Sequence, residues 1–227
     1  FGASAKIQST EAFDTAAEAS DATCNPPAIA GPTTLEVTEV GDELRIISSD
    51  AVCEMGFGEY RFRERYSTTT SIATWGAYGA WTSGAAVIKS DHVPGARYGF
   101  QVEARCAVGT KKSKTVTSDE AEFLTSIAAP TTPTTTVTAD STTVSINAAA
   151  TVCDPGTTAS YRMRYRFATS GSGSYLTGSF GSGRAWTVTP ITRGARYGAV
   201  VDIRCSNALT VSPIITTPEA TTVTAIP

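Results

Sequence analysis

The chain has 227 residues, of which 41% are hydrophobic and 17% charged, and its formal net charge is −3. This length fits one large domain or two domains of about 100 residues, and the composition favours a folded chain over a disordered one. The charge gives no case for nucleic-acid binding, and no apolar run approaches the about 18 residues of a membrane-spanning helix.

Residues 1–30 form an N-terminal lead whose alanine content favours a short helix and which breaks at "CNPP". Its apolar residues, chiefly Ile7 and Phe13, make a poor stripe, so the helix would be marginal alone and we expect it to pack on a neighbour. Because the chain begins at Phe1 without an initiator methionine, we expect a processed product or a fragment.

Residues 31–126 alternate with the period of β-strands. In "YGFQVEARC" (98–106) the apolar residues share one face, and Gln101, Glu103 and Arg105 share the other. In "YRFRERY" (60–66) Tyr60 and Phe62 alternate with arginines in the same way. Short alternating strands separated by turn signals such as "VGD" and "PGA" predict an antiparallel β-sandwich.

Residues 127–227 repeat this unit. "GARYGFQVEARC" (95–106) returns as "GARYGAVVDIRC" (194–205), and "YRFRERY" faces "YRMRYRF" (161–167). A repeat of about 100 residues is too long for a solenoid, so each copy is a whole domain. The proline-rich "AAPTTPTTT" (128–136) separates them. We therefore predict an all-β protein of two tandem immunoglobulin-like sandwiches, with a C-terminal tail on the second.

The repeat also predicts how the cysteines pair. Five cysteines allow 15 ways of making two bridges, but equivalent positions in equivalent folds should bond alike. We therefore expect Cys53–Cys106 and Cys153–Cys205, which would persist in an oxidising compartment. Cys24 is left over, as a free thiol or as a bond to another molecule.

The stretches "VPGARYGFQVEARCAVG" and "ITRGARYGAVVDIRCSN" resemble the fibronectin type III family, over residues 32–124 and 133–218. The resemblance implies that Tyr98 and Tyr197 are corner tyrosines, whose hydroxyls hold the backbone upstream. The chain departs from the family by lacking a tryptophan near the end of the second strand and by its two bridges. His92, the only histidine, takes the turn position that Ile191 has in the second copy.

Two sets of side chains are candidate binding residues. Arg162, Arg164 and Arg166 would form a stripe that faces only Asp202, which leaves a basic face for an acidic partner or for water. The aromatics of "TWGAYGAW", Trp75, Tyr78 and Trp81, could stack on a sugar ring or cover the sandwich. No catalytic cluster, metal motif or cofactor motif appears, so we expect no enzyme and no cofactor.

Charge is divided unevenly along the chain. Residues 1–30 carry one basic and four acidic side chains, whereas residues 127–218 carry seven arginines and three acidic side chains. Such a division favours head-to-tail contacts between copies, which build open filaments when they do not close.

We therefore expect a non-catalytic structural protein, extracellular or on the cell surface, that acts as a spacer or as a subunit of a surface assembly. Two alternatives remain open: a ligand-binding or adhesion module for a carbohydrate or an acidic partner, and an accessory region of a secreted hydrolase.

Overall fold

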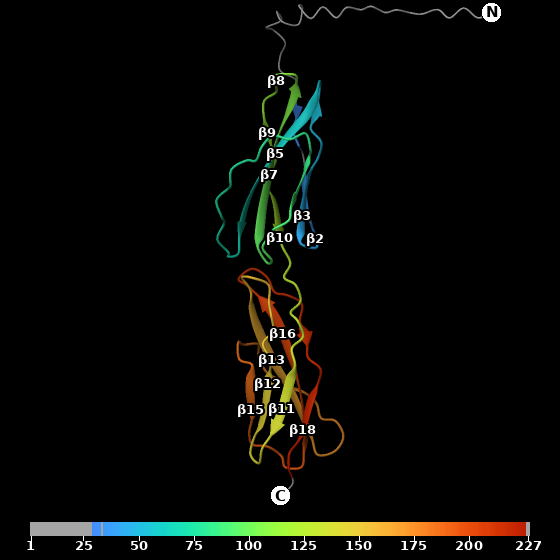
Figure 1. Ribbon diagram of the computed structural model, residues 1–227, viewed down its shortest axis with the longest axis vertical. Coiled ribbons are helices and arrows are strands. Elements are labelled where there is room, and N and C mark those ends of the chain that lie inside the picture. The colour runs from blue at the N-terminus through green and yellow to red at the C-terminus, as the bar shows by residue number, and fades with distance from the viewer. Residues whose placement is uncertain (1–28, 33, 226–227) are drawn as a thin grey trace, which may run out of the picture.

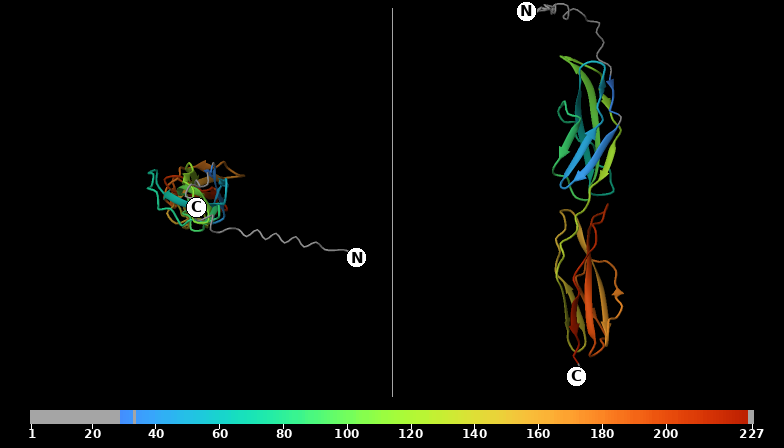
Figure 2. Two further views of the ribbon diagram at one scale, coloured as in Figure 1. Left: turned by 90° about the horizontal axis from the view of Figure 1, so that it is seen from above. Right: turned by 90° about the vertical axis from the view of Figure 1, so that its right-hand side faces the viewer.

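The structure, a computed structural model, describes residues 29–32 and 34–225. These residues form two β-sandwiches that follow each other end to end (Figures 1 and 2). The expected N-terminal helix and Cys24 lie outside the described residues. No helix in the described part of the chain is long and apolar enough to cross a membrane.

In the first domain, two antiparallel sheets face each other. One has the order β2 (Leu35–Val40), β3 (Glu43–Ser48), β6 (Ala86–Lys89). The other has the order β10 (Ala121–Leu124), β7 (Arg97–Val108), β5 (Phe57–Ser67), with β8 (Lys111–Lys112) and β9 (Val116–Thr117) also paired to β7. A separate pair joins β1 (Ile29–Ala30) to β4 (Val52–Cys53), so the first sandwich begins slightly before residue 31.

The second domain repeats this arrangement. One sheet has the order β11 (Thr135–Ala139), β12 (Val144–Ala148), β15 (Ala185–Val188). The other has the order β14 (Leu176–Thr177), β13 (Thr158–Ala168), β16 (Arg196–Ser206), β17 (Ile215–Thr216), with β18 (Ala220–Val223) also paired to β16.

The cores follow the alternation in the sequence. Along β7, Tyr98, Phe100, Val102 and Ala104 are buried, while Gln101 and Glu103 on the other face are partly exposed. Burying each large apolar side chain stabilises the fold by about 1.5–3 kcal/mol, so the alternation fixes which face of each sheet turns inward.

The large aromatic side chains of the two cores come from different strands. Trp186 of β15 packs against both buried clusters of the second domain. Its counterpart on β6, to judge by the strand register, is Val87, which is 38% exposed. The first domain instead fills its centre with Phe62 and Phe100 from β5 and β7. The two domains therefore place the aromatic side chains of their cores at different positions of the same fold.

Each domain has an internal disulfide. Cys53 is bonded to Cys106 and Cys153 to Cys205, with Cα–Cα distances of 5.6 and 5.7 Å. These are the pairs that the repeat predicts. Cys53 lies in β4 and Cys153 in the loop after β12, and each is bonded to the central strand of the opposite sheet, β7 or β16.

Candidate functional site

The arginines of β5 are held by partners on neighbouring strands. The antiparallel register sets Arg61 opposite Glu103, and the two side chains form an ion pair of 2.6 Å. Arg65 reaches past β7 to Glu120, also at 2.6 Å. Between them, Arg63 donates to the Gln101 side chain, with an Nε–Oε1 distance of 3.0 Å. The outer face of this sheet is therefore crossed by polar contacts from edge to edge.

Residues 75–82 run beside β5 in an unusual register. The amides of Gly76, Gly79 and Thr82 donate to the carbonyls of Glu64, Phe62 and Tyr60, at 2.8–2.9 Å. The segment thus advances three residues for every two of β5, about 2.2 Å per residue if β5 rises as an ordinary strand. Aromatics spaced by three then match arginines spaced by two.

The result is an alternating stack of rings and guanidinium groups, which we call the ladder: Arg105, Trp81, Arg61, Tyr78, Arg63, Trp75 and Arg65. Trp81 lies 4.0 Å from the Arg105 guanidinium and 4.7 Å from that of Arg61. Tyr78 and Trp75 each contact two guanidinium groups at 4.6–4.8 Å. Each such contact contributes about 0.5–1 kcal/mol where exposed and more where desolvated.

The ladder is anchored at its Arg105 end by Glu59. The Glu59 carboxylate accepts from Arg105 at 2.7 Å and from Lys112 at 2.8 Å. The hydrogen bond from Lys112 is the main cause that holds the pKa of Glu59 below its usual value, against the opposing effect of burial. The carboxylate is therefore kept charged by its cationic partners.

The second domain has the same stack with one ring missing. Phe180 lies 4.1 Å from the Arg204 guanidinium and 4.6 Å from that of Arg162. Tyr175 lies 5.6 Å from Arg164 and 5.0 Å from Arg166. Between Arg162 and Arg164, where the first domain has Tyr78, the chain has Thr177. We call this set the gapped ladder.

Asp202 holds the two arginines beside the gap. Its buried carboxylate accepts from Arg162 and from Arg164, both at 2.7 Å. Burial acts to raise the pKa of Asp202, but the hydrogen bonds that it accepts, first from Arg164, outweigh burial and place the pKa below its usual value. Two cations therefore share one buried anion.

Arg166 has a different partner from the one expected. It forms a two-pronged pair with Glu219 of the segment before β18, with both hydrogen bonds at 2.7 Å. The prediction that the three arginines of this strand face Asp202 alone is therefore wrong. Sequence spacing along β13 could not show it, because Glu219 lies 53 residues away in the chain.

The glycine after each corner tyrosine makes room for these pairs. A Cβ on Gly99 would collide with the Glu120 carboxylate that holds Arg65, and a Cβ on Gly198 would collide with that of Glu219. Neither glycine has a positive φ. The glycine of the repeated "RYG" therefore leaves space above the central strand, where an arginine–glutamate pair crosses it.

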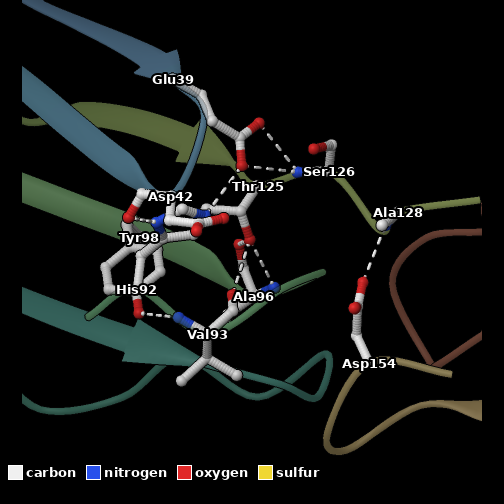
Figure 3. Close-up of polar contacts among 10 residues, drawn as sticks. All are labelled: Glu39, Asp42, His92, Val93, Ala96, Tyr98, Thr125, Ser126, Ala128 and Asp154. Carbon is white, nitrogen blue, oxygen red and sulfur yellow. Dashed lines mark hydrogen bonds and ion pairs between the residues drawn. The ribbon is translucent and has the colours of Figure 1, made fainter. Parts of the chain in front are cut away.

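The turn before each tyrosine is built alike in the two domains. The Tyr98 hydroxyl accepts the Val93 amide proton at 2.8 Å (Figure 3). The Tyr197 hydroxyl accepts the Thr192 amide proton at the same distance. Thr125 supports the first turn by donating its hydroxyl proton to Val93. The two tyrosines thus make the contact that the resemblance implies.

The structure brings together the arginines and the aromatics that the sequence treats as separate candidates. Trp75, Tyr78 and Trp81 are only partly exposed, and each ring already contacts two guanidinium groups. The sequence reasoning missed the anchors Glu59, Glu120 and Glu219. A detectable signal was the match between "W-x-x-Y-x-x-W" and "R-x-R-x-R".

Comparison with known proteins gives structural matches alone. No protein-family model and no curated protein matches the chain. The chain is similar to a segment of two fibronectin type III domains from chicken tenascin, at 18% identity and a TM-score of 0.49, covering 85% of this chain and 100% of that one.

It is also similar to the chicken interferon gamma receptor alpha chain, at 14% identity and a TM-score of 0.35, covering 88% of this chain and 100% of that one. Identities and scores this low carry nothing about what the chain binds. The longer strands follow the same order in both halves, and each half has a tyrosine at the start of its central long strand. Each half of the chain therefore has a fibronectin type III-like β-sandwich fold.

Proposed function

We propose that this chain is a non-catalytic extracellular structural protein, which serves as a cell-surface spacer or as a subunit of a surface assembly. The observation that carries the proposal is the end-to-end arrangement of two sandwiches, each with its own disulfide (Figure 2). Closing loops of this length stabilises each domain by about 4 kcal/mol in the chain-entropy model, and such bonds persist where the surroundings are oxidising.

The titratable groups of the two ladders support a structural role. Glu59, Glu103 and Glu120 in the first domain, and Asp202 and Glu219 in the second, each accept hydrogen bonds from cationic side chains. Groups held in this way stabilise the sheets. They are poorly placed to exchange protons with a substrate, because their partners would have to be displaced first.

The free end of the first domain supports a protein partner. Val52, Met55 and Phe57 lie there and are 68, 61 and 55% exposed. Clustered exposed apolar side chains of this kind are typical of contact surfaces. The charge difference between the acidic lead and the arginine-rich second domain supports contacts between copies.

The carbohydrate alternative is less well supported. A sugar that stacks on Trp75, Tyr78 or Trp81 would compete with the guanidinium groups that already contact these rings. A glycan array tests this alternative directly. Strong binding that is lost in Trp75→Ala and Trp81→Ala would favour it over a pure spacer.

The compartment is tested by trapping thiols in the native cell before lysis, followed by mass spectrometry. We expect Cys53 and Cys106 to be recovered as a disulfide; recovery of both as alkylated thiols would overturn an extracellular role. Electron microscopy of the unreduced protein then distinguishes an assembly subunit from a spacer. Filaments or multimers support assembly, and a monodisperse monomer at high concentration and low salt leaves the spacer alone.

A further inference from the structure

A hydrogen bond joins the two domains directly, and another ties the start of the linker to the second domain. The Asn207 side-chain amide donates to the Gly95 carbonyl at 2.9 Å, and the Ala128 amide donates to the Asp154 carboxylate at 2.8 Å. Asn207 is oriented for this contact, because its Oδ1 accepts from the backbone amides of its own loop at 2.9 and 3.0 Å. Its Nδ2 is thereby directed at the first domain.

Gly95 is needed at this contact for two reasons. Its φ is +69°, a conformation that favours glycine. A Cβ there would also lie 2.6 Å from Asn207 Nδ2 and 2.8 Å from Ile127 Cγ1. A side chain at Gly95 would therefore displace the Asn207 and Ile127 side chains from their places at this contact.

The start of the linker is held from within the first domain. The Ser126 amide donates to both Glu39 oxygens, at 3.1 and 3.2 Å, and His92 Nε2 lies 2.9 Å from Glu39 Oε1 (Figure 3). His92 Nδ1 lies 2.9 Å from the Asp42 carbonyl, and only 6% of the His92 side chain is exposed. Ser126 in turn accepts the Gly95 amide proton at 3.1 Å. A continuous polar chain thus runs from His92 to the second domain.

Glu39, His92 and Asn207 have counterparts of a different kind at the free ends of the two domains, whereas Gly95 recurs as Gly194 and Asp154 as the acidic Glu54. By strand register, Glu39 corresponds to Ala139 and His92 to Ile191, both packed in the second core. The cysteine alignment likewise places Glu54 at the position of Asp154 and Val108 at that of Asn207. Within residues 34–225, nothing donates to the carbonyl of Gly194, the counterpart of Gly95.

We propose that these contacts form a dedicated joint that holds the two domains in one orientation, with Glu39 and His92 as its positioning residues. The frame of each domain is shared, whereas Asn207 contacts the first domain, and Glu39 and His92 hold the start of the linker. The joint would make the rod stiff, and its free ends are built differently, so other copies do not dock through the same contacts.

The test measures the distribution of distances between the domains by pulsed electron paramagnetic resonance. Spin-labelled noncanonical residues at the exposed positions Ile88 and Ile214, one in each domain, leave the native cysteines untouched. We expect one narrow distance peak for the wild-type chain. Asn207→Val, Asp154→Ala and the double variant His92→Ile/Glu39→Ala should each lose it.

Matched changes at the free end serve as controls. Val108→Asn and Glu54→Ala alter the positions equivalent to Asn207 and Asp154, and both should keep the narrow peak. Thermal unfolding shows whether each variant is folded. The double variant carries the residues that the second core already accommodates, and the two loop variants keep the test decisive if it unfolds.

A broad wild-type distribution would overturn the joint. So would joint variants that stay as narrow as the wild type, or controls that broaden equally. The outcome is independent of the compartment, so a stiff joint in an intracellular protein would contradict the proposed function and leave this inference standing.

Discussion

The gap in the ladder of the second domain predicts that Thr177→Tyr is stabilising. Thr177 is exposed and lies opposite Arg164 in the register of β14 and β13, so a tyrosine there projects on the arginine side of the sheet. In the first domain, Tyr78 at the equivalent place contacts two guanidinium groups, at 4.6 and 4.8 Å. Two contacts of this kind contribute about 1–2 kcal/mol.

Differential scanning calorimetry measures the effect. Each kcal/mol of stability moves the midpoint temperature of unfolding of a domain of this size by about 4–8 °C. The midpoint temperature of the second domain should therefore rise, while that of the first domain stays unchanged. The reciprocal change, Tyr78→Thr, should lower the first transition by a similar amount.

Leu176→Tyr is the matched control. Leu176 is 52% exposed on the same short strand but lies opposite Tyr165, so its side chain projects from the other face. It adds the same ring without an arginine on either side. If Leu176→Tyr raised the midpoint as much as Thr177→Tyr, or if Thr177→Tyr raised nothing, ring–guanidinium stacking would not be what stabilises this face.

Three further outcomes follow from the structure. The pair Cys53→Ala/Cys106→Ala should lower the free energy of unfolding of the first domain by about 4 kcal/mol, measured by urea unfolding of the separate transition. The pKa of Asp202 lies below its ordinary value of 3.8 in the folded state. Its contribution to the stability of the second domain is therefore present above that pH and is lost as the pH falls through the folded pKa. Asp202→Asn should weaken the loss of stability of this domain at acid pH, measured by thermal unfolding over a pH series. Gly198→Ala should lower the free energy of unfolding of the second domain by about 1–3 kcal/mol, because the new Cβ displaces Glu219 from Arg166. Gly183→Ala places its Cβ in open space and should change the thermal midpoint of this domain little.

The fold was accessible from the sequence because its signals are local or repeated. Strand alternation showed which residues of β7 turn inward, and the duplicated frame indicated the disulfide partners of Cys53 and Cys153. The lead, with Cys24, lies outside the described residues and stays a prediction.

The ladders were not accessible in the same way. The arginine stripes were visible, but which anion each arginine meets depends on how distant segments fold back. Glu120 and Glu219 come from segments that follow the central strand, 55 and 53 residues from their arginines. The register of residues 75–82 also departs from the two-residue period of a strand, so alternation alone gave no reason to set Tyr78 between Arg61 and Arg63.

Comparing the two domains distinguishes residues that both domains share from residues that differ between them. Positions that are the same in both copies, such as Tyr98 and Tyr197, bond within their own domain. Positions that differ in polarity, such as Asn207 against Val108, lie where one copy meets a neighbouring domain and the other does not. The backbone also differs around these two positions, because Gly109 after Val108 has a positive φ and its counterpart Ala208 does not. The polar Asn207 thus lies at the contact with the first domain, and the apolar Val108 lies at the free end.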